Sequence, residues 1–262
     1  MNLVNRQRAG SGDGTNSFDT ASSWKLNLDF VPTPGNTLIL YLGLTNGINI
    51  DLLLCGSAGV EFAYFGGVAN AGVAVCVCTV PSTPPTNYEV LFGSGGHQFS
   101  SIVEEVHGIS NLTADQLAHA SGSGPAYNSG FTSTTSQRVE YWSNSYAYYN
   151  ASTGADPLGS APSNGYALYS TNPVKHYETG WTWALGGQTA SAPTISAGLL
   201  LGSKFVIEPG VAGGSVTDAN SNVNTYFGAA LAFFGPHTSP SVQINTNPPS
   251  GGLVRFPSLR TR

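Results

Sequence analysis

The sequence predicts an all-β protein, an antiparallel β-sandwich of jelly-roll type with extended termini and one short helix. Short runs rich in β-branched and aromatic residues recur along the chain, separated by Gly, Pro, Asn and Ser. Several runs alternate apolar and polar residues, as strands with one wet face do. The 262 residues suit one large β domain. We expect an N-terminal arm (1–20), a sandwich domain (21–236) and a Pro-rich C-terminal arm (237–262).

The first two strands are predicted to form a hairpin. Residues 24–31, WKLNLDFV, alternate apolar and polar side chains, which indicates a strand of an antiparallel sheet. Pro34 and Gly35 then suit the two central positions of a type II turn. The apolar run TLILYLGL at 37–44 follows as a buried strand.

Residues 71–80, AGVAVCVCTV, predict a strand buried on both faces, because valines occupy one face and Ala74, Cys76 and Cys78 the other. The two cysteines lie roughly 6.6 Å apart along such a strand, which disfavours a disulfide between them. A C-x-C pair alone is also weak evidence for zinc. We interpret both as structural thiols, and a bond from Cys55 to either one stays open.

The remaining strands are expected at fairly regular intervals, which is typical of a sandwich or jelly roll. The segment LTADQLAHA at 112–120 fits a capping box and a hydrophobic staple, and therefore predicts the short helix. The other expected strands are VEFAYFGG, NYEVLFG, FSSIVEEVHGI, QRVEYWSNSYAYY, GYALYS, HYETGWTWAL, AGLLLGSKFVI and NTYFGAALAFF.

Both chain ends differ in composition from the body. The C-terminal segment is Pro-rich and polar, with Val254, Phe256 and Leu259 as its apolar anchors. Two interpretations stay open: a disordered end, or an arm that orders on a neighbouring subunit. Residues 1–20, with Arg6 and Arg8, are a second candidate arm.

Charged residues make up only 9% of the chain, and the net charge is −5. This acidic balance disfavours nucleic-acid binding by the body. No apolar run is long enough to cross a membrane, and no export signal is expected at the start. We therefore expect a virion protein made in the host cytoplasm. So few charges favour a protein whose surface is covered by neighbours in an assembly.

The chain contains, in this order, the motifs FVPTPGN, TLILYLG, a Gly- and Val-rich strand, IVEEVHGISN, SGFTSTTS and TYFGAALAFF. This order resembles a β-sandwich module of virion proteins of tailed bacteriophages and of some bacterial surface proteins. The resemblance covers roughly residues 15 to 236. It implies a structural or receptor-facing role in a tail or capsid, commonly as a homo-oligomer, and it brings no catalytic residues. The strand around 137–152 departs from the module, which usually has a more aliphatic strand there.

The densest ionisable group is Glu104, Glu105 and His107. On a strand the two carboxylates point to opposite faces, so they do not form an adjacent acid/base pair. We expect a structural carboxylate bonded to turn amides. Asp218, with Asn220 and Asn222, resembles a calcium loop but lacks its glycine and its final glutamate, so a turn is the better interpretation.

An aromatic cluster is the strongest feature for binding. Aromatic faces beside Asn and Ser suit sugar rings, protein interfaces or a protein core equally. Its candidate contact residues, for a glycan or a neighbouring subunit, are Tyr141, Trp142, Tyr146, Tyr148 and Tyr149.

Together these observations predict a non-enzymatic virion protein of a tailed phage, a capsid decoration, tail or fibre-associated subunit. We expect no cofactor and no metal. The expected partners are copies of itself, other virion proteins and a host-surface glycan. A carbohydrate- or receptor-binding module is the first alternative, and a glycoside-cleaving enzyme that uses Glu104 or Glu105 is the second.

Overall fold

The computed structural model consists of β-strands wherever its residues are described. The all-β class and the antiparallel pairing predicted from the sequence are therefore confirmed. No helix occurs in this part of the chain. The described residues are 1–10, 18–19, 23–44, 50–55, 58–68, 71–92, 99–110, 112, 116–133, 139–150, 167–169, 182–185, 196–206, 211–217 and 224–235.

The N-terminal half supplies two five-stranded antiparallel sheets, named here sheet A and sheet B. Sheet A has the strand order β1 (Asn2–Gly10), β10 (Phe99–His107), β4 (Thr37–Leu44), β8 (Ala71–Thr79) and β7 (Phe62–Val68). Sheet B has the order β2 (Phe18–Asp19), β3 (Ser23–Asn27), β9 (Asn87–Phe92), β5 (Ile50–Cys55) and β6 (Ala58–Gly59).

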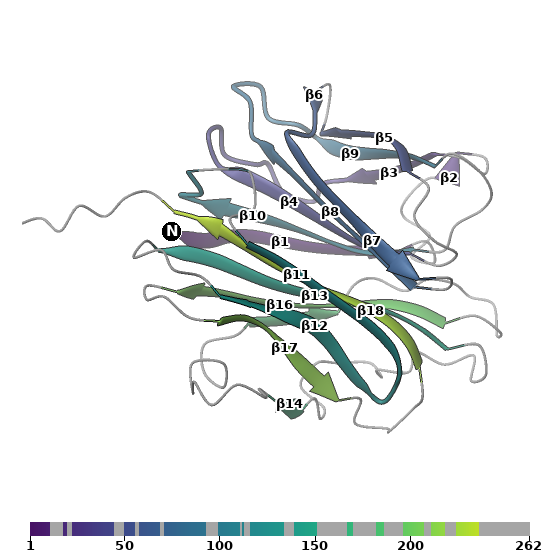
Figure 1. Cartoon of the computed structure of the whole chain (residues 1–262). Helices are drawn as coiled ribbons and strands as arrows, with labels where there is room; N and C mark the ends of the chain where they lie inside the picture. Colours follow the sequence, from purple (N-terminus) through teal and green to yellow (C-terminus); the bar gives the residue numbers. More distant parts are fainter. Residues whose placement is uncertain are drawn as a thin grey trace, which may run out of the picture.

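The C-terminal half supplies sheets C and D, and the four sheets stack in the order B, A, C, D (Figure 1). Sheet C has the order β11 (Gln116–Gly124), β18 (Asn224–Phe234), β13 (Glu140–Asn150), β16 (Ser196–Val206) and β15 (Thr182–Leu185). Sheet D has the order β12 (Ala126–Ser133), β17 (Val211–Thr217) and β14 (Ala167–Tyr169).

Strand β8 is buried on both faces, as the sequence predicted. Cys76 and Cys78 point toward sheet B, where they pack with the leucines of β4 and with Leu26 and Tyr88. Both are buried thiols. Burial raises the pKa of Cys76, which keeps that thiol protonated. The interpretation of Cys76 and Cys78 as structural thiols is consistent with this position. The side chain of Cys55, the possible disulfide partner of either one, lies outside the described part.

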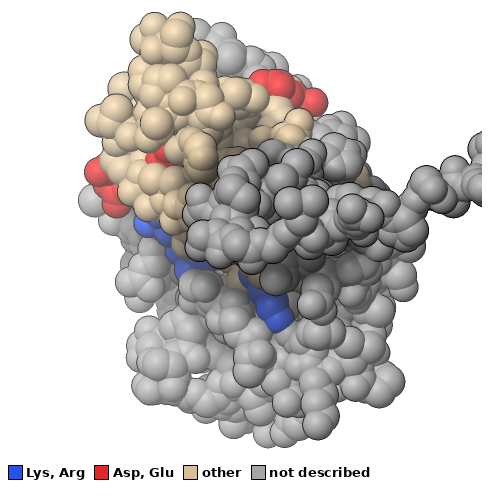
Figure 2. Space-filling model, turned by 90° about the vertical axis from the view of Figure 1, so that its left-hand side faces the viewer, with Lys and Arg blue, Asp and Glu red and all other residues tan. Residues whose placement is uncertain are grey.

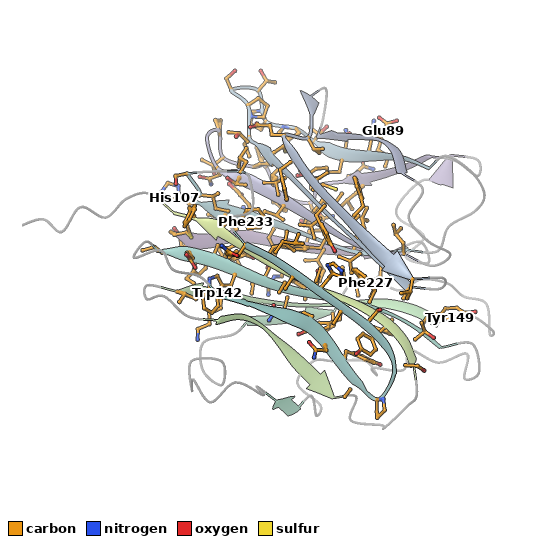
Figure 3. All side chains as sticks on the ribbon, viewed as in Figure 1. Glu89, His107, Trp142, Tyr149, Phe227 and Phe233 are labelled. Atoms are coloured by element: carbon orange, nitrogen blue, oxygen red, sulfur yellow. The ribbon has the colours of Figure 1, made fainter. Side chains whose placement is uncertain are left out.

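The opposite faces of β4 and β8 form the core between sheets A and C. The valines of β8 and Ile39 and Tyr41 of β4 meet aliphatic and aromatic residues of β13, β16 and β18. Phe227 and Phe233 of β18 point into this layer (Figure 3). Sheet A is therefore an inner layer whose central strands have no wet face.

The predicted turn at Pro34 and Gly35 is also present. The backbone N–H of Asn36 donates to the carbonyl of Thr33 at 3.1 Å, and Gly35 has φ +84°. This is the geometry of a type II turn, in which only glycine enters the left-handed region without strain.

The helix predicted at 112–120 is wrong. Gln116–Gly124 is strand β11, which pairs with β18 over nine residues. The capping pattern involves only neighbouring residues, whereas pairing with β18 provides backbone hydrogen-bond partners along the whole strand. Side chains along β11 alternate between half-buried and exposed, as they do in a strand. Tertiary pairing has overridden the local helix signal.

The N-terminal arm expected over 1–20 also needs correction. Residues 2–10 form β1, an edge strand of sheet A paired with β10. Residues 18–19 form β2 of sheet B. The polar side chains of β1 suggested a tail because their partners lie about a hundred positions away along the chain, which no local pattern reveals.

Sheets C and D approach each other closely at Gly228. A Cβ atom there would lie 2.3 Å from the carbonyl oxygen of Asn128 and 2.9 Å from the Cα of Ser129. Because these are backbone atoms of β12, they cannot turn aside as a side chain can.

We expect Gly228→Ala to lower the free energy of unfolding by about 1–3 kcal/mol, the usual cost of overpacking. Gly122→Ala is the matched control, because its new methyl group would meet only the Tyr226 side chain, at 3.0 Å. Chemical denaturation of both variants measures the difference. Equal losses would show that the two sheets are not held at this distance.

Candidate functional site

Glu104 lies at the centre of a buried polar cluster between sheets A and C. Its side chain is 0% exposed. Arg6 of β1 forms an ion pair with Oε1, and its Nε lies 2.8 Å from that oxygen. The hydroxyl of Tyr141 on β13 donates to Oε2. Ser203 of β16 lies 3.3 Å from Oε1 and accepts a hydrogen bond from Arg6 at 3.0 Å.

Strand register explains how this cluster forms. Arg6 lies directly opposite Glu104 in the pairing of β1 with β10, so both side chains project from the same face. That face is packed against sheet C, where Tyr141 and Ser203 stand on adjacent strands. One carboxylate therefore connects β1 and β10 of sheet A to β13 and β16 of sheet C.

Burial and Arg6 have opposing effects on the Glu104 carboxyl. Desolvation raises its pKa above the ordinary value of 4.5, and Arg6 and Ser203 offset only part of that rise. Tyr41 is buried beside this carboxylate. Desolvation, followed by repulsion from Glu104, raises the pKa of Tyr41. The tyrosine is therefore held neutral.

Glu105 points to the other face of β10, as the sequence predicted. Its Oε1 accepts the backbone N–H of Thr33 at 2.8 Å and the amide of Asn36 at 2.5 Å. Its Oε2 accepts the amide of Asn5 at 2.6 Å. The predicted bonding of a carboxylate to turn amides is present at this residue. It anchors both β1 and the Pro34–Gly35 turn.

Hydrogen bonds dominate the acidity of Glu105. Desolvation alone would raise its pKa, but the bonds from Thr33, Asn5 and Asn36 outweigh it and hold the pKa below 4.5. His107, the third member of the predicted group, is exposed and lies with Nδ1 2.9 Å from Oδ1 of Asn36. The group is thus divided between two faces, and its two carboxylates do not converge on one reacting atom.

The aromatic candidates are largely internal. Tyr141 is 0% exposed and faces sheet A, while Trp142, Tyr146 and Tyr148 are buried on the face toward sheet D. The core alternative therefore holds for these four, and they present no surface to a glycan or a second subunit. Only Tyr149 is partly exposed, at the far end of β13 (Figure 3).

Stacking explains why so many tyrosines gather between sheets C and D. The rings of Tyr127 and Tyr148 are parallel at 5.9 Å, and Tyr127 also meets Tyr226 at 5.3 Å. Tyr146 donates to Ser129 at 3.3 Å, so its hydroxyl is satisfied inside the protein. Tyrosine rings whose hydroxyls are hydrogen-bonded inside the protein pack in a core, so a cluster of tyrosines does not require a binding face.

Glu140 is a third buried carboxylate. Its Oε2 accepts the indole N–H of Trp142 at 2.6 Å, and both side chains are about 1% exposed. Lys204 stands opposite Trp142 on β16, where desolvation lowers its pKa. Each of the three buried carboxylates, Glu104, Glu105 and Glu140, therefore has a hydrogen-bond partner within the chain.

Several predicted residues lie outside the described residues. These are the arm anchors Val254, Phe256 and Leu259, and the calcium-loop candidates Asp218, Asn220 and Asn222. Among the described residues, no three His, Cys, Asp or Glu side chains are grouped to hold a metal ion. The described part also forms no helix long and apolar enough to cross a membrane.

Sequence reasoning missed Arg6 as the partner of Glu104. The signal available was indirect: the chain has nine Lys and Arg residues, and a glutamate inside an apolar strand requires a cation or donors. This signal did not identify Arg6 among the nine cationic residues as the partner.

No protein-family model, curated protein or solved structure matches the chain.

We expect Glu104→Gln to lower the free energy of unfolding by about 3 kcal/mol, because it leaves Arg6 without its buried counter-charge. Glu61→Gln is the control, since that exposed carboxylate has one hydrogen bond, from the Thr79 N–H, and surface changes cost about 0.5 kcal/mol or less. Urea unfolding distinguishes the two. Similar losses in both variants would contradict a buried ion pair.

The two carboxylates should respond to acid in opposite senses. The lowered pKa of Glu105 contributes stability that is complete above pH 4.5 and is lost as the pH falls through its folded pKa. The raised pKa of Glu104 contributes stability below pH 4.5 that is lost as the pH rises through its folded pKa.

Glu105→Gln should therefore make the acid loss of stability shallower, and Glu104→Gln should make it steeper. Isothermal denaturation from about pH 7 to about pH 3 measures both slopes. A change of the same sign in both variants would show that the two environments have been misassigned.

Proposed function

We propose that this chain is a non-enzymatic structural subunit of a tailed-phage virion, a capsid decoration, tail or fibre-associated protein that assembles with copies of itself and with other virion proteins. The observation that carries the proposal is the internal use of charge. In a chain with only 9% charged residues, Arg6, Glu104, Glu105 and Glu140 are bonded inside or between its sheets.

Placing four of the 23 charged residues inside leaves correspondingly more of the surface to hydroxyls, amides and apolar groups. Figure 2 supports this for the described part of the face it shows, where Asp, Glu, Lys and Arg form only small groups on a mostly uncharged surface. The core of a protein–protein interface is depleted of charged residues, since charges are costly to desolvate. Such a surface favours permanent contact with neighbours.

The cysteines agree with assembly in a reducing cytoplasm, where virions form. Cys76 and Cys78 remain thiols within an apolar core. The resemblance of several motifs to a β-sandwich module of phage virion proteins gives the proposal its biological setting.

The test is the mass of the full chain in solution, measured by light scattering over a concentration series. We expect an oligomer of defined size that persists from about 0.05 to about 0.5 M salt, because contacts between uncharged surfaces are little screened. A monomer at every concentration, or an oligomer that dissociates in salt, would contradict the proposal.

A further inference from the structure

Strands β7 and β11 are the last described strands of sheets A and C, and they lie on the same side of the molecule (Figure 1). In the part of the chain that is described, β7 pairs only with β8, and β11 pairs only with β18. Each therefore has a row of backbone N–H and C=O groups that faces away from its own sheet. Strand β11 is the longer of the two, with nine regularly paired residues.

The described strands on this side lack the charges, prolines and bulges that normally prevent edge strands from pairing. Neither β7 nor β11 contains a charged residue or a proline, and neither has a bulge. Leu117 on β11 is 39% exposed, and Phe65 on β7 is 43% exposed. The opposite edge of sheet A is protected, because β1 carries Arg6 and Arg8 and has a register shift between Leu3 and Asn5.

The chain itself offers a complementary strand. Residues 237–262 hold three of the nine basic residues and none of the fourteen acidic ones, so this segment carries +3 and the remainder −8. The segment also contains two short runs of alternating side chains, SVQIN and VRF, with prolines nearby. Such runs are typical of peptides that add to a sheet edge.

Geometry favours a tail from a second copy over the chain's own. Strand β18 ends at Phe234, close to the start of β11, because Ala232 pairs with Gln116. An antiparallel strand on β11 must start at Gly124, at the far end. The chain's own tail would first have to cover nine residues of strand, roughly 30 Å, whereas a neighbour's tail can enter there directly.

We propose that residues 237–262 of one copy add as an antiparallel strand to β11 of a second copy, with apolar side chains of the tail beside Leu117. This rests on the proposed self-assembly and names its acceptor strand. The addition continues sheet C across the subunit boundary, through backbone hydrogen bonds.

The test uses the full chain with photoreactive p-benzoylphenylalanine in place of Leu117, mixed with unsubstituted chain labelled with ¹⁵N. We expect illumination to join position 117 to ¹⁵N-labelled peptides from 237–262. The matched control is the same substitution at Val4, which is 41% exposed on the protected edge, and we expect it to give no such product. Cross-links to unlabelled tail alone, no link from position 117 to the tail, or equal yields of tail product from both positions would overturn the assignment.

A second variant separates the two proposals. Leu117→Lys should weaken assembly of the full chain at least about tenfold, because a charge on an edge strand opposes pairing, while Val4→Lys should leave it unchanged. If the chain assembles and Leu117→Lys has no effect, the acceptor strand is wrong and self-assembly stands. If the unsubstituted chain is a monomer, both proposals are wrong.

Discussion

The structure depends on the burial of β4 and β8 on both faces. Every side chain of β4 is buried, so neither of its faces can be left to water. Sheet B covers one face with Leu26 and Tyr88, and sheet C covers the other with β13, β16 and β18. Sheet C in turn has aromatic residues on its outer face, which sheet D covers. The three layers B, A and C follow from this requirement, and the aromatic outer face of sheet C then requires the fourth.

A stack of buried layers restricts where charge can be placed. A carboxylate between two sheets is tolerated only with a full set of donors, because desolvation would otherwise force it to protonate. Glu104 meets this condition with one residue from each of three other strands, and Glu105 meets it with a turn and with β1. These contacts hold the otherwise half-exposed β1 in place.

Sequence reasoning succeeded where the signal is local. The two faces of β8, the Pro34–Gly35 turn and the divergence of Glu104 and Glu105 follow from residue periodicity and turn chemistry. It failed where a distant partner decides. β11 looked helical until its pairing with β18 was known, β1 looked like an arm without β10, and the tyrosines of β13 fit a core and a binding face equally.

Hydrogen exchange of the full chain, read by mass spectrometry, tests the two-sided burial most directly. Amides of β4 and β8 should exchange last, with protection close to the global free energy of unfolding, because sheets B and C must both separate before water reaches them. The edge strands β1 and β7 should exchange earlier. If β4 and β8 exchange as fast as these edges, the stacked arrangement is wrong.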